Sequence, residues 1–176
     1  MRTFIVLAVL VVFSGSLVSQ TVPARARAQE LAASFNKFKS VSKTKYGVTR
    51  EKYKDVHCEP LLKQSIKEYS GVYEATGLGY VIEVRVGNDG VVTGAGYANG
   101  SLSFNLENGR IEAALLTATK VYLNGTREKF EGVFIRRTDK ESPTDPGVTT
   151  TGLGVRFSLP VEIGGSTYER LFYQLH

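Results

Sequence analysis

Five short turn signals divide the sequence after Gly71. Asn-Gly stands at residues 99–100, 108–109 and 124–125, preceded by Asn88-Asp89-Gly90 and followed by Gly164-Gly165. Asn and Gly adopt the positive φ angles that two-residue hairpin turns require, so each signal predicts a reversal between antiparallel strands. This pattern constrains the fold more than any other feature, because it predicts an antiparallel meander and leaves little room for long helices.

The segments between these turns are the expected strands. The segment from Glu112 to Leu123 also fits a helix, since it contains a run of alanine and leucine. We place the strands near residues 71–76, 79–87, 91–98, 101–107, 110–116, 118–123 running into 126–137, 151–162 and 167–175.

Apolar residues alternate with polar ones in four of these segments, which predicts one buried and one solvated face of the sheet. The solvated positions include Glu83, Arg85, Arg156, Ser158 and Gln174. The expected inward residues are Tyr80, Ile82, Val84 and Val86, then Leu102, Phe104 and Leu106, then Leu153, Val155, Phe157 and Leu159, and finally Leu171, Tyr173 and Leu175.

About eight sequential strands leave two sheet edges to protect, and closure into an up-and-down barrel removes both edges. We therefore predict a mainly β fold in which residues 70–176 form an antiparallel, closed barrel. An open twisted sheet wrapped on N-terminal helices would give nearly the same pattern of turns.

The preceding segment, residues 29–69, has a different pattern. Apolar residues recur at helical spacing at Leu31 and Phe35 and again at Leu62 and Ile66, which predicts two or three short helices. Between them, residues 40–48 are polar, rich in lysine and aperiodic, which is typical of a mobile linker.

The first 28 residues resemble a secretory signal peptide. Arg2 precedes an apolar run from Phe4 to Phe13, and Ala26-Arg27-Ala28 fits a small-x-small cleavage site. Ser19 is an alternative cleavage site, and an uncleaved interfacial anchor is an alternative role for the segment. We therefore predict a secreted or periplasmic protein.

Basic residues concentrate in the N-terminal part of the expected mature chain. Residues 29–69 contain nine Lys or Arg and five Asp or Glu, whereas residues 70–176 contain ten and twelve. Export makes nucleic acid an improbable partner for this basic arm. Attraction to anionic lipid or to a cell-wall polymer is the better functional interpretation, and a solvated linker is the alternative.

The stretch Tyr69-Ser-Gly-Val-Tyr-Glu74, followed by a meander through Asn88-Asp89-Gly90, resembles the opening strand of calycins, particularly the lipocalin-like modules of exported bacterial proteins. The resemblance implies a small barrel in an accessory or binding role without catalytic residues. The chain departs from true lipocalins because it has no tryptophan and one cysteine, so it cannot form their disulfides.

Few residues suggest chemistry. Cys58 lies between His57 and Glu59, but sequence neighbours are badly placed to act as a nucleophile and base pair. Two distant histidines and one cysteine match no metal-binding spacing, so we predict no metal and no cofactor. A hydrolase with carboxylates across the barrel mouth has no positive signal; its candidates would be Glu74, Glu83, Glu112 and Glu131.

A hydrolase therefore stays a weakly supported alternative to two non-catalytic functions. The first is a non-catalytic binding module whose barrel accepts a small apolar ligand; its expected lining residues are Tyr73, Tyr80, Phe104, Phe157 and Tyr173. The second is an envelope interaction or structural protein with a solid barrel core, which would contact a protein partner or the membrane surface through the 138–150 loop and the basic arm.

Overall fold

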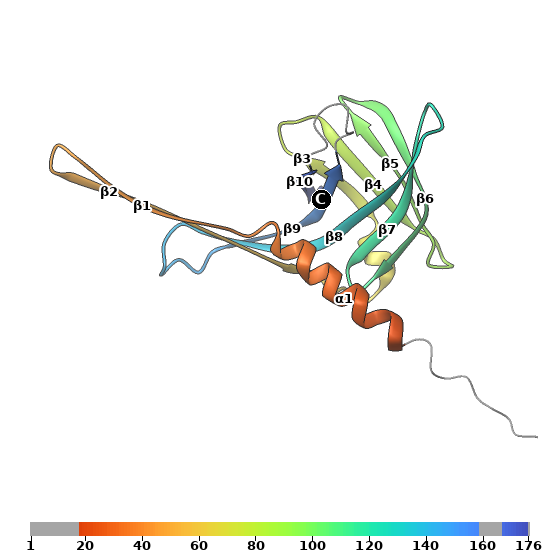
Figure 1. Ribbon diagram of the computed structural model, residues 1–176, viewed down its shortest axis with the longest axis horizontal. Helices are drawn as coiled ribbons and strands as arrows, with labels where there is room; N and C mark the ends of the chain where they lie inside the picture. Colours follow the sequence, from red (N-terminus) through yellow and green to blue (C-terminus); the bar gives the residue numbers. More distant parts are fainter. Residues whose placement is uncertain (1–17, 159–166, 176) are drawn as a thin grey trace, which may run out of the picture.

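The structure is a computed structural model that describes residues 18–158 and 167–175 (Figure 1). It contains one α-helix, α1 (Val18–Ala33), and one short 3-10 helix, η1 (Ile66–Tyr69). The strands are β1 (Lys37–Lys45), β2 (Val48–Pro60), β3 (Gly71–Ala75), β4 (Tyr80–Val86), β5 (Val92–Ala98), β6 (Ser101–Glu112), β7 (Leu115–Tyr122), β8 (Arg127–Lys140), β9 (Val148–Ser158) and β10 (Thr167–Gln174).

The eight strands β3 to β10 close into an antiparallel barrel. Each strand pairs with the next along the chain, and β10 closes the ring by pairing Tyr173 and Gln174 with Glu74 and Tyr73 of β3. The predicted meander and its closure are thus confirmed. No helix in the described part of the chain is long and apolar enough to cross a membrane.

The barrel interior is filled by side chains from alternate positions of every strand. The ring of Phe104 lies across the backbone of Gly96 so closely that a Cβ there would be 2.1 Å from it. The buried residues of this interior cluster are Tyr69, Tyr73, Ala75, Ile82, Val84, Val92, Phe104, Leu106, Ala114, Leu116, Phe130, Phe134, Leu153, Val155 and Phe172.

The expected inward faces are confirmed at the centres of β4, β6 and β9, but β10 is shifted by one residue. Phe172 is buried in the interior cluster, so its neighbours Leu171 and Tyr173 belong to the outer face. Leu175 is 52% exposed, and Leu159 lies outside the described residues. The sequence prediction failed here because three consecutive residues, Leu171 to Tyr173, are all apolar, and alternation cannot choose between them.

The turn between β6 and β7 also differs from the prediction. Asn108-Gly109 lies in a β-bulge inside β6, where the register with β7 shifts between Glu107 and Arg110. The chain reverses instead at Ala113 and Ala114, whose φ angles are 49° and 70°. The carbonyl of Ala114 accepts a hydrogen bond from the backbone N–H of Phe134, which holds the turn against β8.

The lysine-rich segment that was expected to be a mobile linker forms a β-hairpin instead, and the short helices expected on either side of it correspond to the end of α1, at Ala33, and to η1. β1 and β2 pair over their whole common length around the turn Tyr46-Gly47, whose φ angles of 54° and 77° are typical of a two-residue hairpin turn. Only residues 55–60 of β2 also pair with β8, so the remainder of the hairpin projects away from the barrel (Figure 1). The loop expected over residues 138–150 is shorter, because β8 continues to Lys140 and β9 begins at Val148.

Helix α1 covers the outer face of the barrel beside the root of the hairpin. Its last turns and Phe35 pack on β2, β7 and β8 and form an outer cluster of buried residues: Ala28, Leu31, Ala32, Phe35, Val56, Cys58, Leu115, Val133 and Ile135. Arg27 donates hydrogen bonds from Nε and Nη2 to Oε2 of Glu131 on β8, at 3.1 and 2.5 Å. These hydrogen bonds lower the pKa of Glu131 despite its burial.

We expect Ala113→Gly to raise the free energy of unfolding by roughly 0.5–1 kcal/mol, because an alanine in the left-handed region is strained and glycine is not. Urea denaturation measures this change. Ala98→Gly is the control, because Ala98 lies in extended backbone of β5 and its replacement lowers stability. If Ala113→Gly is no more stable than the wild type, the backbone at Ala113 is not strained.

We expect Arg27→Ala to lower the free energy of unfolding by roughly 1–2 kcal/mol, because it removes charged hydrogen bonds from Glu131, whose side chain is only 14% exposed. Glu30→Ala is the matched control: it removes the other partner of Arg27, which is 62% exposed, and should change stability by less than about 0.5 kcal/mol. Equal effects of the two substitutions would show that the Glu131 contact contributes nothing.

Candidate functional site

The five aromatic residues that the sequence assigned to a ligand site do not share one cavity. Tyr73 and Phe104 lie in the interior cluster, and Phe157 packs against it. Tyr80 is 41% exposed at the start of β4, with the guanidinium carbon of Arg170 4.7 Å from its ring centroid. Tyr173 lies on the outer face, where its hydroxyl accepts a hydrogen bond of 2.6 Å from Nη1 of Arg137.

Packing occupies the three inner aromatic residues. Tyr73 is 1% exposed, and its hydroxyl donates a hydrogen bond of 2.8 Å to the carbonyl of Tyr69. Its ring centroid is 5.6 Å from that of Phe134, and the ring of Phe157 is 6.3 Å from that of Phe172. These contacts are those of a filled barrel core.

Lys120, which the sequence pattern did not single out, points into the barrel. Lys120 is 7% exposed and follows Leu116 and Ala118 on the inward face of β7. Its Nζ lies 4.8 Å from the ring centroid of Tyr122, 5.4 Å from that of Phe104 and 5.7 Å from that of Phe157. The sequence contained a signal for this position, because every second residue of β7 faces inward and Lys120 belongs to that series. The series is Leu116, Ala118, Lys120 and Tyr122.

A carboxylate completes the surroundings of this lysine. Oε2 of Glu128 lies 2.9 Å from Nζ of Lys120 and accepts a hydrogen bond of 3.0 Å from the hydroxyl of Tyr122. Burial lowers the pKa of Lys120, but the interactions with Tyr122 and Glu128 outweigh it and leave the pKa raised. The raised pKa favours the charged form of the lysine at neutral pH. The ammonium group of Lys120 makes cation–π interactions with the aromatic rings around it.

The remaining candidates for chemistry are separated. Burial raises the pKa of Cys58, so its thiol stays protonated at neutral pH. His57 is exposed and occupies the next position on β2, on the opposite face. Glu83 lies between the inward-facing Ile82 and Val84 and therefore points outward, and Glu131 is bound by Arg27 of α1 on the outer face, so these carboxylates do not face each other across a mouth. The described residues contain no group of three or more His, Cys, Asp or Glu able to hold a metal.

The most unusual surface is on the hairpin, where six exposed lysines share one side. Residues directly opposite each other in an antiparallel pair point to the same face, and alternate residues of a strand do so too. Lys39 lies opposite Lys54, and Val41 lies opposite Lys52. We call this side the basic face; its lysines are Lys37, Lys39, Lys43, Lys45, Lys52 and Lys54.

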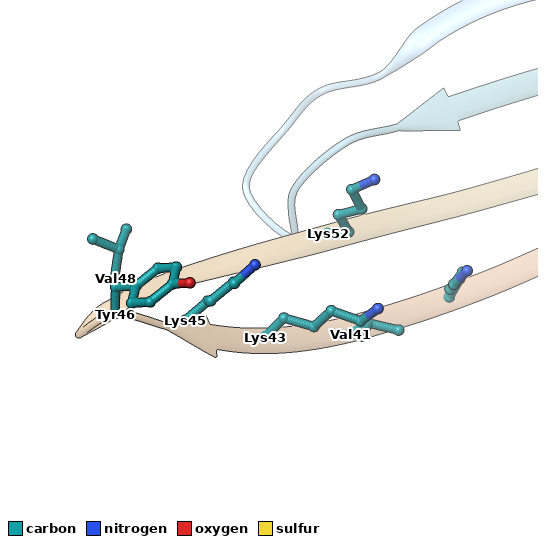
Figure 2. A pocket seen from close by; sticks show the side chains of 7 residues that line it. Val41, Lys43, Lys45, Tyr46, Val48 and Lys52 are labelled. Atoms are coloured by element: carbon teal, nitrogen blue, oxygen red, sulfur yellow. The ribbon is translucent and has the colours of Figure 1, made fainter.

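Apolar side chains lie among the lysines towards the tip of the basic face. Tyr46 is 91% exposed and Val48 is 59% exposed, and Nζ of Lys45 lies 5.1 Å from the Tyr46 ring centroid. Figure 2 shows these side chains gathered on one side of the ribbon. They line a shallow hollow of about 560 Å³ together with Lys39, Val41, Lys43 and Lys52.

The other face of the hairpin has a different character. Phe38 and Tyr53 pack edge to face with their ring centroids 5.7 Å apart, and the hydroxyls of Thr44 and Thr49 are 3.0 Å apart. Ser40 and Ser42 complete this side of β1, and Asp55 lies opposite Phe38. The lysines of the hairpin are thus confined to one face.

This distribution of charge destabilises the isolated hairpin. Lys39 and Lys54 are directly opposite each other, and like charges in that position repel. The ion pairs found between described side chains include none of the six lysines. A two-stranded hairpin is in any case marginal in water without a further partner. A bound anion would relieve the repulsion.

The root of the hairpin is nevertheless well fixed. Residues 55–60 of β2 pair with β8, and Oδ1 of Asn36 accepts a hydrogen bond of 2.7 Å from the backbone N–H of Cys58. Val56 and Cys58 are buried under α1. The barrel therefore sets the direction in which the basic face points.

We expect acidification from pH 7 to pH 3 to destabilise the wild type more than Lys120→Met. Lys120 lowers the pKa of Glu128 below its usual 4.5, so this contribution to stability is complete above pH 4.5 and is lost as the pH falls through the lowered value. Methionine removes the ammonium and with it most of that shift. Melting temperatures from circular dichroism at both pH values test this, and an identical loss in both proteins would contradict it.

We compared the chain with models of protein families, with curated proteins and with solved structures, and none of them matches it. The geometry of the molecule therefore has to carry the argument for its function.

Proposed function

We propose that this chain is an exported, non-catalytic interaction protein, in which a solid barrel supports a hairpin whose basic face binds an anionic partner in the cell envelope. The observation that carries the proposal is the presence of six exposed lysines on one face, without an acidic partner among the described side chains. Such a face attracts anions at long range and is screened by salt.

The packed interior supports this function over the binding of a small apolar ligand. A ligand beside Tyr73 or Phe104 would have to displace side chains that already touch, because Tyr73 is 1% exposed and Phe104 covers Gly96. The resemblance to lipocalin-like modules is compatible with the closed eight-stranded barrel. We propose that the likeness is one of architecture, with the barrel in an accessory role.

The loop between β8 and β9 is a poor candidate for the same contact. It contains Glu141 and Asp145, and the carboxylate of Asp145 accepts hydrogen bonds from the backbone N–H groups of Glu141 and Gly147. These bonds lower the pKa of Asp145 and keep it negatively charged. An anionic partner would meet the basic face of the hairpin in preference to this loop.

Export remains part of the proposal, and helix α1 bears on the processing site. Cleavage after Ala28 would cut inside α1 and remove Arg27 from Glu131, whereas cleavage after Ser19 would leave the rest of the helix in place. We therefore favour the site after Ser19, which N-terminal sequencing of the exported protein identifies.

The proposed function predicts that charge reversal on the basic face weakens binding to a soluble polyanion. In Lys43→Glu/Lys52→Glu the affinity for heparin, measured by calorimetry, should fall roughly thirtyfold or more, since each lysine near an anionic surface contributes about 1 kcal/mol. The control is Lys67→Glu/Arg110→Glu, which makes the same change in net charge at exposed positions of η1 and β6. Equal losses in the two variants would show that the basic face is not the binding surface.

A further inference from the structure

We infer that the anionic partner of the basic face is a phospholipid bilayer, and that Tyr46 and Val48 at the tip of the hairpin enter its interfacial layer. The inference rests on the proposed function and names the partner for the same surface. Its support is the exposure of the apolar side chains of Tyr46 and Val48, which a purely electrostatic contact does not require.

The first observation is the position of these groups. Tyr46, Val48 and Val41 line the same hollow as Lys39, Lys43, Lys45 and Lys52, so a single flat partner meets both kinds of side chain at once. Lysine ammonium groups bind lipid phosphates, while tyrosine rings favour the boundary between headgroups and acyl chains. A basic surface with an exposed aromatic residue at its apex fits a bilayer better than a soluble polymer.

The second observation is the conformation of the turn. Tyr46 has a φ of 54°, a region in which bulky residues are uncommon and which Asn or Gly occupies readily. The structure thus places an aromatic side chain where local turn chemistry favours a small one. The side chain is 91% exposed and contributes little to packing, so folding alone does not account for it.

The third observation is the reach of the hairpin. The last β2–β8 pair joins Asp55 to Lys140, and at a rise of ~3.4 Å per residue the tip lies roughly 25 Å beyond it. Over this distance β1 and β2 pair only with each other among the described strands. At its root the basic face is on the side that α1 covers, because Lys37 lies opposite Val56, so we place the contact with the bilayer on the outer part of the basic face, towards Tyr46 and Val48.

The absence of tryptophan from the sequence allows a direct test. Tyr46→Trp provides a single fluorescent reporter at the tip, and Phe38→Trp provides a matched reporter on the opposite face, where Phe38 is 71% exposed. Each protein is mixed with vesicles of equal parts phosphatidylglycerol and phosphatidylcholine, with vesicles of phosphatidylcholine alone, and with heparin.

We expect the emission of Tyr46→Trp to shift to shorter wavelength and to be quenched by acyl-chain-brominated lipid in anionic vesicles only. Phe38→Trp should change little in all mixtures. Tyr46→Ser/Val48→Ser should lower partitioning into anionic vesicles about tenfold and leave heparin affinity unchanged, because it removes apolar contact and no charge.

Each other outcome overturns a defined part of the argument. Sedimentation with anionic vesicles without a spectral shift at position 46 would mean contact by charge alone and would overturn insertion. Heparin binding that depends on Lys43 and Lys52, without vesicle binding, would keep the proposed function and overturn the bilayer as partner. Binding to neither probe would overturn both the inference and the proposed function.

Discussion

The backbone pairing of β8 is the constraint on which the rest of the molecule depends. One edge of this strand pairs first with β7, over residues 127–133, and then with β2, over residues 135–140. The other edge pairs with β9 over residues 132–139 and so continues the barrel wall. Because β8 belongs to the barrel and also pairs with β2, the barrel anchors the root of the hairpin and sets the direction in which the basic face projects.

The buried Lys120 and the lysines of the basic face differ in how their positive charge is balanced. Inside the barrel, the charge of Lys120 is balanced by Glu128 and by three aromatic rings. On the hairpin, Lys39 and Lys54 face each other without an acidic neighbour across the strands. This contrast is why the outer surface, and not the interior, is the better candidate for binding.

Much of the barrel could be predicted because its signals are local. Turn residues at 88–90, 99–100 and 124–125 adopt the expected reversals, and Ile82, Val84 and Phe104 face inward as alternation indicates. The hairpin was not predicted because lysine alternates with serine and threonine along β1, whereas a strand is usually recognised from apolar residues that alternate with polar ones. Residues 40–48 were therefore interpreted as a polar linker. Nothing in the local sequence distinguished the bulge at residues 108–109 from a turn.

The antiparallel meander follows from the amino-acid sequence alone, because turn chemistry and side-chain alternation act between near neighbours. Closure of the meander, the inward position of Phe172 rather than Tyr173, and the burial of Lys120 beside Glu128 depend on the three-dimensional packing. The position of the lysines of residues 37–54 on one surface depends on the tertiary structure as well. These outcomes depend on which strands pair and in which register, and that choice is made by contacts between residues far apart in the chain.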